Sequence, residues 1–256
     1  MTYLLTFIFG LVFGSFVNVL IYRIPRGENF VTDRSKCPHC HAFIEWYDLI
    51  PLLSFLVLNG KCRNCGAKIS WSYFWVEFYS GLIFLLSFMV FGNFGVGLWL
   101  ANVAILEIFL ILFMTDIKEL ILPDSVILAG IVIALAGFKT FNSISVEHLL
   151  TALIYLLFFS AVWFLSKGKW LGFGDGKLMF LVGLVFGAVA SVVVLYMAVI
   201  LGTIIGLGLL LFKKANLKTR LPLGAFICFS ASVYIFFGNV IISKLGSIYL
   251  ILNIFK

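Results

Sequence analysis

The sequence predicts an all-α polytopic membrane protein with about eight transmembrane helices and one small polar loop domain. Of its 256 residues, 63% are hydrophobic and 11% are charged, and the mean hydropathy is +1.16. A soluble domain is only about 45–50% apolar. Apolar runs of about 20 residues, the length that a helix needs to cross a bilayer, recur along the chain. The net charge of +7 does not indicate a nucleic-acid partner, because the basic residues alternate with these runs instead of forming one stripe.

Seven apolar runs give the expected helices. They cover residues 3–21, 73–91, 98–115, 124–141, 149–166, 178–212 and 222–243. The first run has neither a basic region before it nor a small-residue cleavage site, so we expect a retained helix rather than a signal peptide. The run 178–212 is too long for one span, since its residues rise about 1.5 Å each and the hydrocarbon core is about 30 Å thick. It predicts two short helices that turn near residues 187–191, or one strongly tilted helix.

The distribution of positive charge favours two helices in this run. Fifteen of the 18 lysines and arginines then fall on one side of the membrane, and only Lys139, Lys244 and Lys256 fall on the other. Cytosolic loops carry the excess of basic residues in membrane proteins. We therefore expect eight spans and an external N-terminus, with the 22–72 loop, Asp116 and Asp175 on the cytosolic side.

Four parts follow from this topology. Residues 1–21 form the first transmembrane helix, and residues 22–72 form the cytosolic loop domain. Residues 73–243 form a core of seven transmembrane helices, and residues 244–256 form a tail that is too short to span and is expected in the outer interface.

The polar loop contains a predicted metal site. Cys37 and Cys40 form one C-x-x-C pair, and Cys62 and Cys65 form a second pair after an interval of 21 residues. This spacing is typical of four thiolates around one tetrahedral Zn²⁺, which would be structural because the coordination shell is closed. Two disulfides or a redox C-x-x-C are the alternatives, and the predicted cytosolic position disfavours disulfides. Cys228 stands alone in an apolar run and is interpreted as a packing residue.

Two aspartates are the candidate catalytic residues. Asp116 ends one apolar run, and Asp175 precedes another within a glycine-rich turn that also contains Gly172, Gly174 and Gly176. Two carboxylates in close contact share a proton, which is the minimum equipment of an aspartyl hydrolase. The glycines permit positive φ and leave room for an extended substrate to approach. Asp175 begins a helix, so it is the predicted base and Asp116 the predicted protonated partner. The alternatives are a helix-end acid at Asp116 and a merely flexible turn at Asp175.

Other polar residues in the apolar runs have less specific interpretations. Asp124 is expected to cap or charge the N-terminus of the next helix. Glu107 lies in the middle of a span, where it is either a functional residue or a neutral group hydrogen-bonded to another helix. Asn18 and Asn102 are expected to hydrogen-bond between helices.

Several motifs together resemble the bacterial type IV prepilin peptidases, the bifunctional leader peptidase and N-methyltransferase family of GxGD aspartyl proteases. The resemblance runs from Gly14 to about Phe226. The motifs that carry it are residues 14–25, 34–40, 44–51, 60–65, 115–116, 122–124 and 172–178. The chain departs from the family pattern at Leu49, where asparagine is usual, and at residues 72–74.

The resemblance implies a multi-pass enzyme of the bacterial cytoplasmic (inner) membrane. It implies that Asp116 and Asp175 activate the water that cleaves a prepilin or pseudopilin precursor after its leader, and that the loop 22–72 binds zinc. It also implies methylation of the new N-terminal residue by S-adenosylmethionine. Because the loop 22–72 has no glycine-rich nucleotide motif, the methyl-donor site is not evident from the residues. Glu77 is a possible member of that site, or an ordinary acid near the start of a helix.

Three alternative functions remain open from the sequence. The first is a peptidase without methylation. The second is a polytopic cation transporter with a structural zinc loop, which predicts charges near the bilayer midplane and an internal repeat. The third is a zinc-ribbon scaffold that docks a cytosolic partner, which gives the glycine-rich turn at Asp175 no function.

Overall fold

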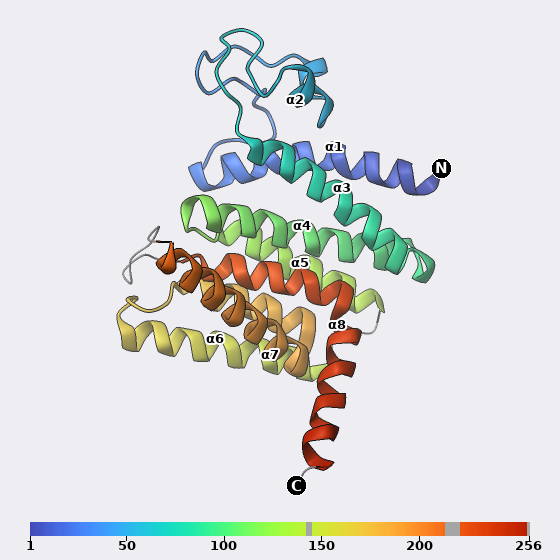
Figure 1. Ribbon diagram of the computed structural model, residues 1–256, viewed down its shortest axis with the longest axis vertical. Helices are drawn as coiled ribbons and strands as arrows, with labels where there is room; N and C mark the ends of the chain where they lie inside the picture. Colours follow the sequence, from blue (N-terminus) through green and yellow to red (C-terminus); the bar gives the residue numbers. More distant parts are fainter. Residues whose placement is uncertain (142–144, 213–220, 255–256) are drawn as a thin grey trace. The chain divides into compact units, whose positions relative to one another are not determined.

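The computed structural model describes residues 1–141, 145–212 and 221–254 and divides the chain into two compact units. Unit 1 is Met1–Thr115 and unit 2 is Asp116–Lys256. Helices form the framework of both units, and the described residues contain isolated bridges but no strand. The expectation of an all-α protein is therefore confirmed (Figure 1).

Unit 1 is organised around the close crossing of two long helices. Helix α1 covers Thr2–Arg23 and helix α3 covers Trp71–Phe91. Gly10 and Gly14 allow the backbones to meet, because a Cβ added at Gly10 would lie 2.8 Å from the Gly81 Cα, and one added at Gly14 would lie 2.8 Å from the Glu77 Cα. Small residues spaced four apart are typical of such close contacts in membranes. The 3₁₀ turn η3 (Gly92–Phe94) then leads to helix α4, which covers Val96–Glu119 and crosses the boundary into unit 2.

The polar loop between α1 and α3 has little regular structure. It contains the 3₁₀ turns η1 (Ile24–Arg26) and η2 (Trp46–Leu49) and the short helix α2 (Leu53–Val57). Isolated bridges join Lys36 to Phe43 and Lys61 to Lys68. A segment this small has few apolar residues with which to form its own core.

Unit 2 continues with four helices after the end of α4. They are α5 (Asp124–Phe141), α6 (Val146–Ser166), α7 (Phe173–Leu211) and α8 (Leu223–Ile254). Gly183 brings α7 directly onto α6, because an added Cβ would lie 2.9 Å from the Ala152 Cα. Leu178 and Met179 of α7 and Ile227 of α8 are fully buried in the core of this unit.

Helix α7 is divided at Gly187. This residue has φ 70° and ψ −172°, a non-helical conformation that a side chain would strain. The first half places Gly174 against Leu122, and the second half places Gly202 and Gly206 against Phe226 and Leu221 at the beginning of α8. Because Leu122 also contacts Gly224 of α8, the second half of α7 returns toward the level at which the first half began. Figure 1 shows both ends of α7 on the same side of unit 2. The predicted turn near residues 187–191 is thus found at Gly187.

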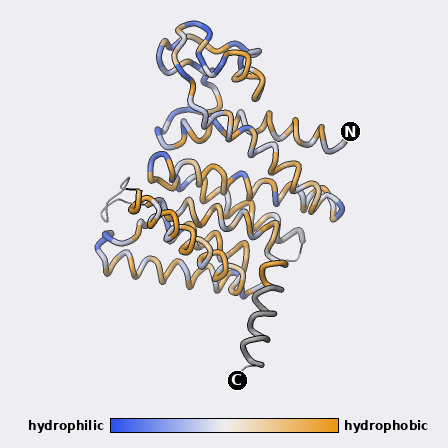
Figure 2. Tube along the Cα trace, viewed as in Figure 1, coloured by the Kyte–Doolittle hydropathy of each residue, from blue (hydrophilic) through white to orange (hydrophobic). Residues whose placement is uncertain are grey.

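The helices have the composition of membrane spans. Among the described residues, α1 with η1, α3 with η3, α4, α6 and α7 are long and apolar enough to cross a bilayer. Two apolar segments, Asp124–Gly137 and Leu223–Gly238, are shorter. Figure 2 shows hydrophobic residues along the helices and hydrophilic ones concentrated in the 22–72 loop and near helix ends. Helix α8 continues to Ile254, so part of the predicted 244–256 tail is helical, and its interfacial position remains a prediction.

Candidate functional site

Asp116 lies in the last turn of α4 and is held by the beginning of α8. Its side chain is buried, with 6% of its surface exposed. The carboxylate Oδ2 accepts the Ala225 backbone N–H at 2.7 Å, and a Cβ added at Gly224 would lie 2.9 Å from the same oxygen. Unpaired N–H groups and the dipole make the N-terminus of a helix a good site for an anion. Gly224 lets that N-terminus reach the carboxylate.

Asp175 occupies the first turn of α7 and is half-buried. Its Oδ2 accepts the Gly172 backbone N–H at 3.0 Å, while its own N–H bonds to the Gly172 carbonyl at 3.2 Å. This reciprocal arrangement caps the helix and also fixes the carboxylate. Asp175 therefore begins a helix as predicted. Both aspartates accept a backbone N–H at a helix N-terminus, so the assignment of one as base and the other as proton carrier stays a prediction.

The structure brings the two predicted aspartates into one neighbourhood of unit 2. The side chain of Leu122 contacts Gly174, next to Asp175, and also Gly224, which lies against Asp116. The charge of Asp116 acts on the Asp175 carboxyl group, and both act on the fully buried Cys228. Because Asp116 and Asp175 come from α4 and α7 and α8 supplies an N–H, three helices build the site.

An ion pair joins the two aspartate motifs and was missed by the sequence analysis. The Lys177 Nζ donates to both carboxylate oxygens of Asp124 at 2.7 Å. Asp124 begins α5, as expected of a helix N-terminal acid, and Lys177 lies two residues after Asp175 on α7. The signal available in the sequence was the lysine two residues after Asp175, but nothing there identified its partner.

The three glycines around Asp175 do not share one role. None has a positive φ, so the conformational freedom expected of them is not used. Gly174 and Gly176 instead allow close packing, since added Cβ atoms would lie 3.2 Å from the Leu122 Cβ and 3.1 Å from the Phe159 Cβ. Gly172 is exposed. An approach of substrate along the backbone remains a prediction, and of the three glycines Gly172 is the one left open to it.

The four cysteines of the polar loop form a cluster that could hold a metal ion. Their sulfur atoms all lie within 4.8 Å of one another, and those of Cys37 and Cys65 are 3.9 Å apart. Zn–S bonds of about 2.3 Å in a tetrahedron put sulfurs about 3.8 Å apart, so the cluster fits zinc. The two knuckles share one backbone pattern, because the Cys37 N–H bonds to the Ala42 carbonyl at 2.9 Å and the Cys62 N–H to the Ala67 carbonyl at 2.8 Å.

Electrostatic contacts stabilise this cluster and the loop beside it. The backbone N–H of Cys40 donates to the Cys37 sulfur and lowers the pKa of that thiol to about 6, which favours the thiolate that a metal requires. Arg63, between the second pair of cysteines, forms a bidentate ion pair with Asp48 at 2.6 and 2.9 Å. Hydrogen bonds from Arg63 hold the pKa of the Asp48 carboxyl below its usual range.

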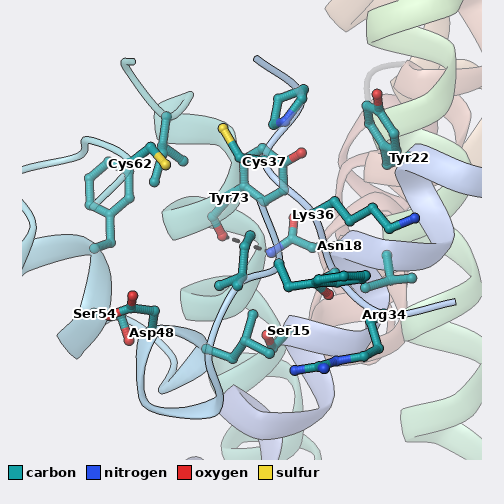
Figure 3. Close-up of a pocket in the computed structure, with 18 of the residues that line it drawn as sticks. Ser15, Asn18, Tyr22, Arg34, Lys36, Cys37, Asp48, Ser54, Cys62 and Tyr73 are labelled. Carbon is teal, nitrogen blue, oxygen red and sulfur yellow. Dashed lines mark hydrogen bonds between the residues drawn. The ribbon is translucent and has the colours of Figure 1, made fainter. Parts of the chain in front are cut away.

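A cavity of about 610 Å³ opens between the polar loop and the adjoining parts of α1 and α3. Glu77, the possible member of a methyl-donor site, lines it. At its wall the Asn18 side chain donates to the Tyr73 carbonyl at 3.0 Å, as Figure 3 shows. Asn18 thus bonds between helices as predicted. Asn102 does not, because its amide donates to the Leu98 carbonyl one turn earlier in its own helix.

Glu107 lies in a second buried polar group of unit 1. Only 2% of its surface is exposed, and Ser80 of α3 bonds to its Oε1 at 2.7 Å. The Ser80 hydroxyl also lies 2.9 Å from the Gly10 carbonyl of α1. The alternative of a hydrogen bond to a neighbouring helix is therefore confirmed. This contact gives Glu107 a role in joining three helices.

Comparison with known proteins agrees with this arrangement. The bacterial peptidase A24 N-terminal domain matches residues 8–91, and the type IV leader peptidase family matches residues 103–207. A prepilin leader peptidase/N-methyltransferase of Legionella pneumophila is 32% identical, over 94% of this chain and 93% of its own. The chain belongs to the type IV leader peptidase family.

Other members of the family are similar over most of the chain. The prepilin leader peptidase/N-methyltransferase of Bacillus subtilis is 29% identical over 93% of this chain and 95% of its own. The protein of that name from Myxococcus xanthus is 35% identical over 80% of this chain and 62% of its own. No solved structure matches the chain. The first family model lies within unit 1 and includes the polar loop, whereas the second runs from the end of unit 1 into unit 2 and includes both aspartates.

Proposed function

We propose that this protein is a membrane aspartyl endopeptidase that removes the leader of type IV prepilin-like precursors and methylates the new N-terminal residue. One observation carries the proposal. Asp116 and Asp175 are 59 positions apart in the sequence, yet α7 and α8 meet around Leu122, which supports a single site for both carboxylates. Relatives named prepilin leader peptidase/N-methyltransferase supply the substrate class and the second activity.

The peptidase reaction uses the two carboxyl groups in turn. The ionised member takes a proton from a water molecule, whose oxygen attacks the scissile carbonyl carbon. The protonated member donates its proton to the carbonyl oxygen, which relieves the charge that develops there. When the tetrahedral intermediate collapses, the carbonyl re-forms and the departing amine takes up a proton from the dyad. The backbone N–H groups of Gly172 and Ala225 hold the carboxylates in position throughout.

The site should lie at the cytosolic edge of the membrane. If each half of α7 spans the membrane, as the break at Gly187 supports, these halves and the helices α1, α3, α4, α5, α6 and α8 would make the eight expected spans. The excess of basic residues then falls beside Asp116 and Asp175, which supports an external N-terminus and an inner-membrane location. A precursor has an apolar helix, which lies in the lipid, and a basic leader, which lies in water. The boundary between the two would lie at the same depth as the site.

The cysteine cluster would hold a structural Zn²⁺. Cys37, Cys40, Cys62 and Cys65 supply a complete tetrahedral thiolate shell, which leaves no open position for catalysis. The ion would cross-link the two knuckles of a loop that has no substantial core of its own. The Zn²⁺ ion would take no part in peptide hydrolysis, because the two carboxyl groups activate the water.

Methylation requires S-adenosylmethionine, which supplies an electrophilic methyl group on a sulfonium. The residues of unit 1 fit such a cofactor, because the cavity there has a volume within the range of about 300–1,000 Å³ for small-molecule sites. It also combines aromatic walls with a carboxylate, Glu77. The chain's own residues would bind and orient the donor and would hold the acceptor amine.

A cation transporter is not favoured. Its strongest support in the sequence was Glu107, and this side chain bonds to Ser80 in a buried contact between helices. The scaffold hypothesis does not explain the paired aspartates.

Mass measurement of a processed substrate tests the proposal. The purified protein in detergent is incubated with a prepilin, with and without S-adenosylmethionine. We expect loss of the leader in both samples and an added methyl group only with the donor. Asp116→Asn and Asp175→Asn should each leave the prepilin intact. Normal leader removal by either variant would end the assignment of the dyad.

A further inference from the structure

The cavity of unit 1 brings together segments to which the aspartyl reaction assigns no task. Ser15 and Asn18 come from α1, and Glu77 comes from α3. The loop contributes residues 48–50, next to the turn that begins α2. Figure 3 shows Ser15, Asn18 and Tyr73 gathered on one side of this space, with Asp48 and Ser54 across from them. Segments from both helices and the loop therefore face one cavity.

Glu77 is fixed where α1, α3 and the loop meet. Its Oε2 accepts the Leu52 backbone N–H at 2.9 Å, and the Ser15 side chain interacts with the same carboxylate. Gly14 permits this arrangement, because any larger residue there would press on the Glu77 backbone. Among the described carboxylates that line the cavity, Glu77 is the one that a membrane-spanning helix supplies. Asp48 is occupied by Arg63.

The bond to Glu77 depends on a strained turn of the loop. Leu52 has φ 59° and ψ −47°, and the Leu53 N–H bonds to the Pro51 carbonyl at 2.6 Å. This is a γ-turn of the rare form with positive φ, which is unfavourable for a residue with a side chain. Strained backbone of this kind persists where the surrounding structure requires it, often at functional sites. Here the turn orients the Leu52 N–H toward Glu77, and the resulting hydrogen bond fixes the position of the carboxylate.

The chemistry of the cavity suits a reaction between two cations. A sulfonium methyl donor is positively charged, and an α-amine is an ammonium ion until it loses a proton. Aromatic residues of the wall, including Phe16, Tyr22, Tyr73 and Phe74, can accommodate both an apolar N-terminal side chain and a cationic group. A carboxylate among them can attract the ammonium and remove its proton.

We propose that this cavity is the methyl-transfer site and that Glu77 is the base for the acceptor amine. The identity of the donor rests on the proposed function. The ammonium group transfers one proton to the Glu77 carboxylate. The nitrogen lone pair then attacks the methyl carbon, and the carbon–sulfur bond breaks with its electron pair left on sulfur. The products are an N-methylated ammonium and the neutral thioether S-adenosylhomocysteine, and the proton on Glu77 passes to water.

The location of Glu77 supports an acceptor that is attached to an apolar helix. Glu77 lies two turns into α3, close to the end at which α3 joins the polar loop. A mature pilin that remains in the bilayer would present its N-terminal amine at such a boundary between apolar and polar surroundings. The cavity therefore offers the donor space on the loop side and the acceptor a place beside the helices.

A pair of glutamate variants tests the role of Glu77. Glu77→Gln removes the base, and Glu107→Gln makes the same change at a buried glutamate of unit 1 that does not line the cavity. The full-length proteins are compared by mass measurement of a prepilin product and by calorimetric binding of S-adenosylhomocysteine. For Glu77→Gln we expect wild-type leader removal, thioether binding within about threefold, and methylation reduced by about 100-fold or more. Glu107→Gln should methylate normally.

The outcomes separate this inference from the function on which it rests. If the wild type methylates and Glu77→Gln methylates equally well, Glu77 is not the base, although the proposed function stands. If the wild type removes the leader but neither methylates nor binds the thioether, the methyltransferase function itself fails.

A labelling experiment on the unmodified protein locates the cavity independently of any variant. The wild type is irradiated with methyl-labelled S-adenosylmethionine, digested, and mapped by mass spectrometry, with excess S-adenosylhomocysteine as the competitor. We expect the competed label in peptides that contain residues 15–23 or 41–77. Competed label confined to residues 116–225, or the absence of any competed label, would overturn the assignment.

Discussion

The two units hold polar sites of different construction. In unit 1 an irregular loop that carries four clustered cysteines lines a cavity beside one helical carboxylate, Glu77. In unit 2 two carboxylates are held by the N-termini of helices. The difference matches the proposed chemistry. Methyl transfer needs space for a cofactor, which a loop can enclose, whereas peptide hydrolysis needs only two rigidly placed acids and a water molecule. We infer that the two activities can be lost separately.

The largest expected effect is the loss of cleavage in Asp175→Asn. An amide cannot accept the proton from water, so leader removal should fall by about 10²–10⁴-fold. The variant should still methylate a peptide acceptor that already begins at the mature N-terminus, and both rates are measurable by mass spectrometry. If methylation of this pre-cleaved acceptor also disappeared, the separation of the two sites would be wrong. Asp33→Asn, a change of the same kind in the polar loop, serves as the control for cleavage.

Removal of the proposed zinc should affect mainly unit 1. Joint replacement Cys37→Ser and Cys62→Ser removes two of four ligands, and structural zinc sites contribute roughly 10–16 kcal/mol to the folding of small metal-dependent domains. We expect zinc content to fall from one per chain to none and methylation to fall by more than about tenfold. Elemental analysis and the two activity measurements check this.

Cys228 offers a matched control for the zinc variant. It is fully buried in α8, outside the cluster. Cys228→Ser should therefore retain the metal. An unchanged zinc content in the double variant would contradict the metal site.

Substitution of Gly187 should weaken unit 2 alone. Gly187→Ala places a side chain at φ 70°, 3.1 Å from the His148 ring, and strained residues of this type cost about 1–3 kcal/mol. The thermal unfolding temperature and the cleavage rate should fall, while zinc content stays constant. Gly208→Ala, in the same helix with open space around it, should be neutral or stabilise by up to about 1 kcal/mol. Equal effects of the two substitutions would show that the break at Gly187 is not needed.

The smallest effect is expected at the ion pair between Lys177 and Asp124. The side chains are 31% and 71% exposed, so water screens the pair and its contribution should be about 0–1 kcal/mol. Lys177→Met and Asp124→Asn should each change cleavage by less than about threefold. A double-mutant cycle on cleavage and unfolding measures the coupling. A much larger loss in only one variant would identify a catalytic role for that side chain beyond the pair.

Features determined by neighbouring residues could be predicted from the sequence. The two C-x-x-C pairs predicted a cluster because each knuckle brings its own thiols together, and the excessive length of the run 178–212 predicted the break at Gly187. The start of a helix near Asp175 followed from the apolar run after it, and α7 begins at Phe173. In each case the physical cause lies within a few residues or in a simple comparison of length with bilayer thickness.

Features that depend on tertiary partners could not be predicted. The bonds from Ala225 to Asp116 and from Leu52 to Glu77 join segments whose pairing is set by helix packing. The expectation that Asn102 bonds between helices was wrong. A side-chain amide in a helix can equally donate to a backbone carbonyl of the preceding turn, as Asn102 does to Leu98. The bond between Ser80 and Glu107 likewise depends on how α3 and α4 pack, which the residues around either side chain do not reveal.

The contact between Asp116 and Ala225 has a consequence for biosynthesis. The two residues are 109 positions apart, and Ala225 belongs to α8. During translation the ribosome releases Asp116 and Asp175 well before the segment that supplies this N–H. A nascent chain halted before α8 therefore contains both acids without the support that positions one of them, so proteolytic competence should arise only after α8 has been made.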